Sequence, residues 1–131
     1  MPRFDVEEFR RERKRMNEAL LGQDHLGLKR FWALDSRAYE PGALDAKTKE
    51  LLGLVASTVL RCNDCIAYHI DQSHSVGVTK EELLDALNVA LVVGGSITIP
   101  HLRVAWDVVA QVYDGKKASE LDAHAAHGHG H

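Results

Sequence analysis

The chain has 131 residues, the length of one ordinary domain. Its 16 lysines and arginines stand against 19 aspartates and glutamates, which gives a formal net charge of −3. This balance argues against nucleic acid as the main partner, because binding a phosphate backbone requires a basic excess. Hydrophobic residues make up 45% and charged residues 27%, a composition that excludes intrinsic disorder and is typical of a globular protein.

The N-terminus does not look like a targeting signal. Residues 1–8 read MPRFDVEE and lack the apolar stretch of a secretory signal peptide. No apolar run in the chain reaches the ~18 residues that a membrane span needs. We therefore expect a cytoplasmic protein with no membrane association. In that reducing compartment, the two cysteines indicate chemistry rather than a structural disulfide framework.

Helical patterns cover nearly the whole chain, since β-branched residues never alternate with polar ones over the length of a strand. The first two helices are predicted at 5–21 and 28–38. The first is very polar at its centre, where 10–15 reads RRERKR. We interpret this basic run as a solvated helix face rather than a nucleic-acid contact, because glutamates are interleaved with it.

Capping residues delimit four further helices, predicted at 46–61, 63–76, 80–93 and 100–113. Asp45 can cap the first of these, and Gly77 is a good stop for the second. Thr79, with Glu82 three residues later, matches a capping box. Pro100 suits the first turn of the last helix. Helices joined by short connections indicate an all-α fold, a compact helical bundle of about six helices.

Beyond residue 113 the sequence turns small and polar and ends in a histidine-rich tract. The histidines are His124, His127, His129 and His131. Such a tract can bind nickel, zinc or copper. The other interpretation is a flexible terminus with no fixed site.

The cysteines form the most informative cluster. If a helix begins near Cys62, then Cys62, Cys65 and His69 share one stripe of it. The N-terminal end of a helix and a protonated imidazole both favour the reactive thiolate, so the stripe is a candidate redox centre. Two alternatives stay open: a structural zinc site, for which these residues supply only three of four ligands, and unreactive buried cysteines beside a core histidine.

Glu50 is the candidate acid–base partner of this stripe. It lies in a largely apolar stretch of the helix that precedes the cysteines. A carboxylate that faces the core from that helix could meet the cysteines and His69, where burial would let it exchange protons. The alternative is a solvated surface glutamate, which is the commoner fate of this residue type.

Four segments together carry a resemblance to a known family. They are GALDAKTKEL at 42–51, CNDC at 62–65 followed by His69, GVTKEEL at 77–83, and the Gly94-Gly95 break. In this order and spacing they resemble the carboxymuconolactone decarboxylase/alkylhydroperoxidase D superfamily. The resemblance covers about residues 28–113 and implies the all-helical alkylhydroperoxidase D-like fold. Residues 1–27 would then be an N-terminal helical extension, and 114–131 a flexible histidine-rich tail.

The resemblance implies a thiol-dependent peroxidase that reduces hydroperoxides with a dithiol or protein reductant and uses no metal or other cofactor. Cys65 would be the peroxidatic nucleophile that becomes a sulfenic acid, and Cys62 the resolving thiol. Glu50 and His69 would form a proton relay for the thiols and the leaving alkoxide or hydroxide. One residue departs from the pattern: Asp64 stands where alkylhydroperoxidase D has a histidine, and an acid beside Cys65 disfavours the thiolate.

Other functions remain open at this point. The family's decarboxylases act on a lactone carboxylate and lack the cysteine pair, so Cys62 and Cys65 argue against that reaction. A disulfide reductase, or a carboxymuconolactone decarboxylase-like protein with another substrate, is the alternative among enzymes. The alternative of another class is a non-catalytic metal-binding module in which the cysteines and the histidine tail supply ligands.

We also expect a homo-oligomer. Residues 83–93 and 102–112 are apolar on nearly every side of their helices, and such helices must be buried on most sides. A chain of this size has little room to enclose both, so the surplus apolar surface should be covered by another subunit. The family resemblance suggests a hexamer or a trimer.

Overall fold

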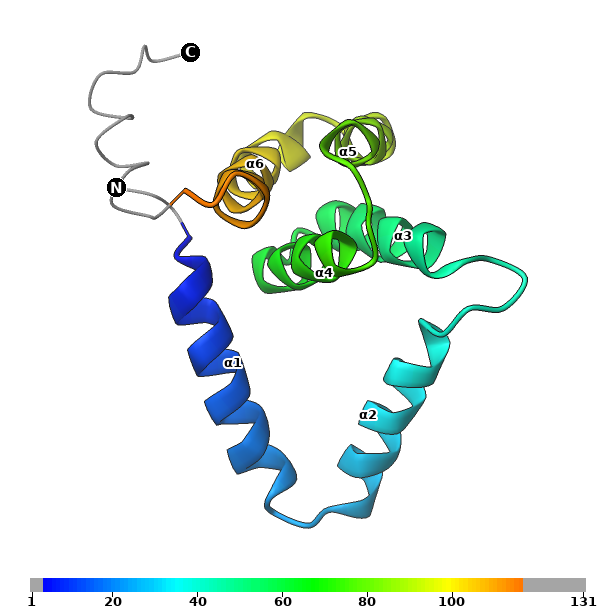
Figure 1. Cartoon of the computed structure of the whole chain (residues 1–131), viewed down its shortest axis with the longest axis vertical. Helices are drawn as coiled ribbons and strands as arrows, with labels where there is room; N and C mark the ends of the chain where they lie inside the picture. The colour runs from blue at the N-terminus through cyan, green and yellow to red at the C-terminus, as the bar shows by residue number, and fades with distance from the viewer. Residues whose placement is uncertain (1–3, 117–131) are drawn as a thin grey trace.

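A computed structural model describes residues 4–116, which form six α-helices and one short 3-10 helix (Figure 1). The elements are α1 (Val6–Leu21), α2 (Leu26–Ala38), α3 (Ala46–Val59), α4 (Asn63–Ser75), α5 (Lys80–Gly94), η1 (Ser96–Thr98) and α6 (Ile99–Tyr113). The predicted all-α fold class is confirmed, and residues 4–116 contain no strand. The histidine-rich tail predicted for 114–131 lies almost wholly outside the described residues.

Local capping explains where the helices begin. The Asp45 carboxylate accepts a hydrogen bond of 2.8 Å from the backbone N–H of the third residue of α3. Thr79 and Glu82 exchange both hydrogen bonds of the predicted capping box at the start of α5. The second helix begins at Leu26, two residues earlier than predicted, because the His25 ring accepts a backbone hydrogen bond and serves as its cap.

Helices α3 to α6 form the packed core. α3 packs against α4 and α5, and α4 packs against α6 (Figure 1). Their facing sides bury Leu54, Ile66, Ile70, Leu83 and Val108, each 0% exposed. Ile66 and Ile70 of α4 thus face the core. Full burial of one such side chain contributes roughly 1.5–3 kcal/mol.

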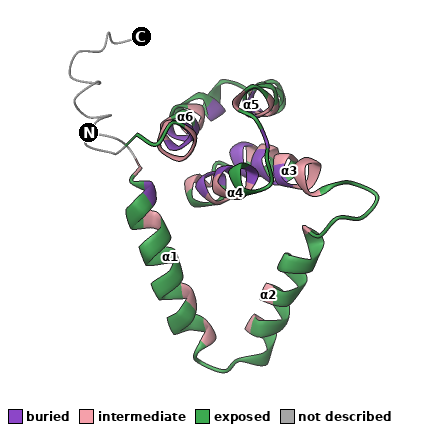
Figure 2. Cartoon of the chain, viewed as in Figure 1, coloured by how far each residue is buried: buried purple, intermediate pink, exposed green. Residues whose placement is uncertain are grey.

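Helices α1 and α2 project from this core as the two arms of a V (Figure 1). The arms are joined by residues 22–25, and both are largely exposed (Figure 2). No residue of α2 is buried, and its Phe31 and Leu34 are 62% and 67% exposed. The fold therefore leaves apolar side chains in water along an arm that has almost no packing partner.

Polar contacts hold the first turns of α1 against the core. Gln111 of α6 donates a hydrogen bond of 2.7 Å to the carbonyl oxygen of Phe4 and accepts one of 3.0 Å from the N–H of Val6. Arg10 donates to both carboxylate oxygens of Asp71 on α4, at 2.5 and 2.9 Å. These contacts fix the beginning of α1 beside α4 before the helix runs away from the core.

None of the helices in residues 4–116 combines the length and the hydropathy that a membrane-spanning helix requires.

Candidate active site

The turn between α3 and α4 places the cysteines. α3 ends at Val59 rather than at the predicted residue 61, because Arg61 adopts a left-handed conformation with φ of 61°. This reversal brings the N–H of Cys62 to the carbonyl oxygen of Ser57, at 3.0 Å. The Cys62 sulfur becomes the N-cap of α4 and accepts a hydrogen bond of 3.2 Å from the N–H of Cys65.

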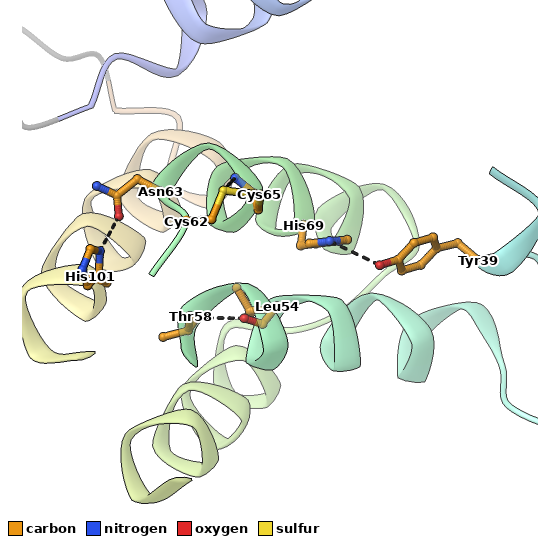
Figure 3. The surroundings of a disulfide bond; sticks show 8 residues. All are labelled: Tyr39, Leu54, Thr58, Cys62, Asn63, Cys65, His69 and His101. Carbon is orange, nitrogen blue, oxygen red and sulfur yellow. Dashed lines mark hydrogen bonds between the residues drawn. A yellow bond between two sulfur atoms is a disulfide. The ribbon is translucent and has the colours of Figure 1, made fainter. Parts of the chain in front are cut away.

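Cys62 and Cys65 are joined by a disulfide bond (Figure 3). Their Cα atoms are 5.3 Å apart, within the usual range for a disulfide. Cys65 is exposed, whereas Cys62 is half-buried. Both sulfurs lie at the N-terminal end of α4, where unpaired backbone N–H groups would stabilise a thiolate after reduction.

Glu50 and His69 form a buried pair between α3 and α4. The carboxylate Oε1 lies 2.9 Å from Nδ1 of the imidazole, and both residues are buried, at 6% and 7% exposure. Glu50 is therefore not the solvated surface glutamate that its residue type makes common. A carboxylate in this position needs a polar partner, since burying an unpaired charge is costly.

Tyr39, at the end of α2, is the second partner of His69. Its hydroxyl lies 3.4 Å from Nε2 of the imidazole (Figure 3). Burial raises the pKa of the Tyr39 phenol, and the nearby Glu50 carboxylate raises it further, so the hydroxyl stays protonated at neutral pH. It can then donate to Nε2 while Nδ1–H donates to Glu50. Lys49 fastens this loop to α3 by donating to the carbonyl oxygens of residues 38 and 40, at 2.9 and 2.6 Å.

Gly53 makes room for the imidazole. This residue lies in the middle of α3, where glycine costs about 1 kcal/mol relative to alanine. A β-carbon at this position would lie 2.5 Å from Cε1 of His69 and 2.8 Å from both ring nitrogens. The glycine therefore lets the ring lie directly on the backbone of α3, one turn beyond Glu50.

The N-terminus of α4 is fixed from the other side by α6. Nδ1 of His101 lies 2.7 Å from Oδ1 of Asn63, the first residue of α4 (Figure 3). Asp64, the next residue, is exposed in the first turn, where a carboxylate interacts favourably with the helix dipole. The disulfide is thus carried on a helix end that α6 holds in place.

The four residues singled out from the sequence fall into two linked pairs. Cys62 and Cys65 form the disulfide, while Glu50 and His69 form the buried pair. Both ring nitrogens of His69 face oxygen atoms, and the ring is directed toward Tyr39 in Figure 3. The imidazole is connected to the sulfurs by one turn of α4, from residue 65 to residue 69.

Sequence reasoning missed Tyr39, Gly53 and His101. A glycine in the middle of an otherwise strong helix was the one available signal, because such a residue often marks a close approach. Nothing in the sequence near Tyr39, which follows the helix predicted at 28–38, indicated a contact with a residue thirty positions later.

Residues 4–116 contain no group of three or more histidine, cysteine, aspartate or glutamate side chains arranged to hold a metal ion. The histidine tail, on which the predicted metal-binding alternative partly depended, lies outside this range.

Gly53→Ala should change the free energy of unfolding in opposite directions in the presence and in the absence of the His69 imidazole. In the unaltered chain we expect a loss of about 1–3 kcal/mol, because the new methyl group overlaps the imidazole. In a His69→Ala background the same change should raise stability by up to about 1 kcal/mol, the ordinary helix preference of alanine. Urea unfolding of the four proteins, followed by circular dichroism, measures both effects. An equal effect in both backgrounds would contradict the proposed overlap.

Comparison with known proteins identifies the family. Residues 26–108 match the model of the carboxymuconolactone decarboxylase family. A carboxymuconolactone decarboxylase family protein from Thermotoga maritima, for which an involvement in an antioxidative response has been suggested, is 50% identical, with a TM-score of 0.78. The alignment covers 86% of this chain and 96% of that one.

Two further relatives are more distant. A carboxymuconolactone decarboxylase family protein from Legionella pneumophila is 31% identical, with a TM-score of 0.55, over 82% of this chain and 86% of its own. An uncharacterized protein of the cox locus of Paracoccus denitrificans is 29% identical over 82 residues, 63% of this chain and 74% of that protein. The sequence match, the helical fold and the structural neighbours together show that the chain belongs to the carboxymuconolactone decarboxylase family, within the superfamily that includes alkylhydroperoxidase D.

Proposed function

We propose that the protein is a thiol-dependent peroxidase that reduces hydroperoxides through Cys62 and Cys65. One observation carries the proposal: a disulfide at the N-terminus of α4 lies one helical turn from a buried carboxylate–imidazole pair. A redox-active dithiol and an acid–base pair are the two things that peroxide reduction by thiols requires. The antioxidative role suggested for the Thermotoga maritima relative points in the same direction.

Each turnover consumes one hydroperoxide and one dithiol. The Cys65 thiolate attacks the O–O bond, which breaks to leave a sulfenic acid on Cys65 and an alkoxide that takes up a proton. The Cys62 thiol then attacks the sulfenic sulfur, and water leaves as the disulfide forms. A dithiol or protein reductant returns two electrons and two protons to the disulfide and is itself oxidised to a disulfide. Such reduction fits a cytoplasmic protein.

Exposure supports the assignment of the two sulfurs. Cys65 is exposed, so a peroxide can reach it, whereas Cys62 is half-buried in the turn that follows α3. Cys65 is also the third residue of α4, within the turn whose free N–H groups favour a thiolate. Cys62 as the N-cap is close enough to resolve the sulfenic acid without a change of backbone.

The buried pair would supply the protons. His69 lies on the same helix face as Cys65, four residues later. After reduction its Nε2 would take a thiol proton in exchange for the 3.4 Å contact with the Tyr39 hydroxyl and return that proton to the alkoxide. Glu50 stabilises the imidazolium that forms in between, because it faces Nδ1 at 2.9 Å. Tyr39 acts as a positioning residue, since it contacts the imidazole rather than the sulfurs.

The metal-binding alternative has less support. The two sulfurs are bonded to each other and so are not available as thiolate ligands in this state. The candidate ligand His69 faces two oxygen partners inside the protein.

Substitution of the two cysteines should have different results. Cys65→Ser should abolish peroxide reduction. Cys62→Ser should still form a sulfenic acid at Cys65 but fail to turn over, and serine keeps the N-cap of α4. Labelling with a dimedone-type probe, followed by mass spectrometry, identifies the oxidised sulfur. A label found on Cys62 alone would reverse the roles and favour a disulfide reductase in which the first cysteine attacks.

Glu50→Gln should lower kcat/KM at neutral pH by about 10²- to 10⁴-fold, the usual contribution of a general acid–base group. The amide oxygen can still accept the hydrogen bond from His69, so we expect only a small change in the free energy of unfolding. Glu81→Gln, on the exposed face of α5, is the matched control and should leave activity unchanged. Activity of the Glu50 variant within a few-fold of the unaltered protein would remove this carboxylate from the mechanism.

We propose further that the protein is a homo-oligomer, a hexamer or else a trimer. α6 buries Val104 and Val108 within its own chain, but Val92 and Val93 of α5 are 77% and 67% exposed. α2, on which Phe31 and Leu34 are 62% and 67% exposed, lies on a different part of the molecule from α5 (Figure 2). Apolar surface in two places is more than a monomer usually leaves in water, and a second copy of the chain is the simplest cover.

Light scattering coupled to size exclusion should give a mass near a multiple of 14.5 kDa, six-fold for the hexamer. Phe31→Ser combined with Leu34→Ser should lower that mass, because both exposed side chains would leave the interface. The control is Arg30→Ser with Arg37→Ser on the same helix, which should leave the mass of the assembly unchanged. A mass near 14.5 kDa at micromolar concentration would contradict the proposal.

A further inference from the structure

His101 and Asn63 form a hydrogen bond that the proposed mechanism does not use. Nδ1 of the imidazole lies 2.7 Å from Oδ1 of the side-chain amide, and both residues are half-buried. An amide oxygen can only accept a hydrogen bond, so Nδ1 carries the proton and donates it. The contact joins α6 to the residue that directly follows Cys62, beside the disulfide (Figure 3).

The break between α5 and α6 directs the first turn of α6 toward α4. Gly95 has φ of 79°, a conformation that favours glycine, and Oγ1 of Thr98 donates a hydrogen bond of 2.8 Å to its carbonyl oxygen. Thr98 is 0% exposed, and a β-carbon at Gly94 would lie 2.4 Å from its methyl carbon. The two glycines therefore let the chain turn sharply over this threonine, and α6 begins where His101 meets α4.

The disulfide and the His101–Asn63 contact hold the same turn. Asn63 lies inside the small ring that the Cys62–Cys65 bond closes, so the turn is fixed covalently while that bond is intact. After reduction only non-covalent contacts fix it. Among them are the hydrogen bond of 2.9 Å from the N–H of Ile66 to the carbonyl oxygen of Cys62 and the contact with α6. The first turn of a helix frays easily, so the contact with α6 matters most when the disulfide is open.

Resting on the peroxidase function proposed above, we infer that His101 is a positioning residue of the redox centre: through Asn63 it keeps the first turn of α4 formed in the reduced chain. Cys62 then stays within reach of the sulfur of Cys65 and resolves the sulfenic acid. His101 acts here on the geometry of the attack and not on the reacting atoms. The atoms and electrons balance as written above, because the contact changes only how readily the disulfide closes.

The direction of the effect follows from the two oxidation states. In the closed form the turn cannot fray, so loss of the contact costs its full contribution. In the open form the turn can fray, which avoids part of that cost. The closed form is therefore destabilised more, and the effective concentration of Cys62 toward Cys65 should fall. The net contribution of one hydrogen bond sets the size of this fall at about three- to tenfold.

Exchange with glutathione measures the effective concentration without any peroxide. The Cys65 thiolate attacks glutathione disulfide and releases one glutathione thiolate, and the Cys62 thiolate then displaces the second glutathione and closes the protein disulfide. The ratio of closed to mixed disulfide, at a known glutathione concentration and a fixed pH, gives the effective concentration of Cys62. We expect His101→Leu to lower it about three- to tenfold. A tenfold fall corresponds to a reduction potential higher by about 30 mV.

His101→Asn is the conservative variant. Its amide nitrogen can take the place of Nδ1 and donate to Asn63, so the effective concentration should be nearly retained. Asn63→Ala should repeat the loss seen with His101→Leu, and the double variant should lose no more than either single one, since both remove the same contact. An unchanged effective concentration in His101→Leu, equal losses in the leucine and asparagine variants, or additive losses in the double variant would overturn the inference.

Two controls separate positioning from general stability. Val108→Ala shortens a fully buried side chain of α6 and should lower the free energy of unfolding while the effective concentration stays the same. Arg103→Gln replaces an exposed residue of α6 close to His101 and should also leave it unchanged. A loss with either control as large as that with His101→Leu would show that any weakening of α6 has this effect, and would overturn the assignment.

Trapping of the sulfenic acid connects the contact to the proposed function. With cumene hydroperoxide, His101→Leu should still oxidise Cys65, but the fraction labelled by a dimedone-type probe should rise several-fold because resolution by Cys62 is slower. An unchanged labelled fraction would overturn the role of His101 in resolution. If neither protein formed a sulfenic acid, the proposed peroxidase function would fail, while the glutathione equilibrium would still decide whether His101 positions the two sulfurs.

Discussion

The contact between Glu50 and His69 is the interaction on which the rest of the site depends. A carboxylate and an imidazole that are both buried cost free energy to remove from water, and each is tolerated because it faces the other. The pair also joins α3 to α4, the two helices that flank the turn with the cysteines. Loss of either partner would leave an unpaired polar group in the core, which typically costs about 3–5 kcal/mol. The same contact therefore supports both the packing of α3 against α4 and the chemistry proposed for this region.

The buried Glu50–His69 pair also constrains the residues around it. The imidazole can lie flat on α3 only because residue 53 has no β-carbon. Its second nitrogen needs a partner, and Tyr39 supplies a hydroxyl from the end of α2. Lys49 in turn fastens the backbone around Tyr39 to α3. A loop that would otherwise only connect two helices is thus tied to the interior of the protein.

The sequence predicted the fold class and most helix starts because these depend on local signals. Asp45 and the Thr79–Glu82 box are caps whose hydrogen bonds join residues three positions apart, so both caps can be recognised from a short stretch of sequence. The stripe of Cys62, Cys65 and His69 follows in the same way from the periodicity of one helix. The catalytic roles of these residues and of Glu50 stay predictions, because geometry brings groups together without showing what they do.

What could not be predicted depends on contacts across the fold. The end of α3 at Val59 follows from the left-handed backbone of Arg61, a residue type that rarely signals such a turn. The position of α1 beside α4 depends on where Gln111 holds the backbone at Phe4 and Val6, a contact between residues more than a hundred positions apart. Each of these features needs the tertiary arrangement before it can be seen. The basic run at 10–15 of α1, by contrast, is exposed throughout, as its interpretation as a solvated helix face predicts.

The disulfide closes a very small ring of chain, with a sequence separation of 3. Cross-links stabilise proteins mainly by restricting the unfolded chain, and on the chain-entropy model so short a loop contributes only about 2 kcal/mol, against about 4.7 kcal/mol for a loop of 100 residues. The core of α3 to α6 is built from a cluster of buried aliphatic side chains that includes neither cysteine. Reduction of this bond would therefore remove little of what keeps the chain folded, and the oxidised and reduced chains should share one nearly unchanged scaffold.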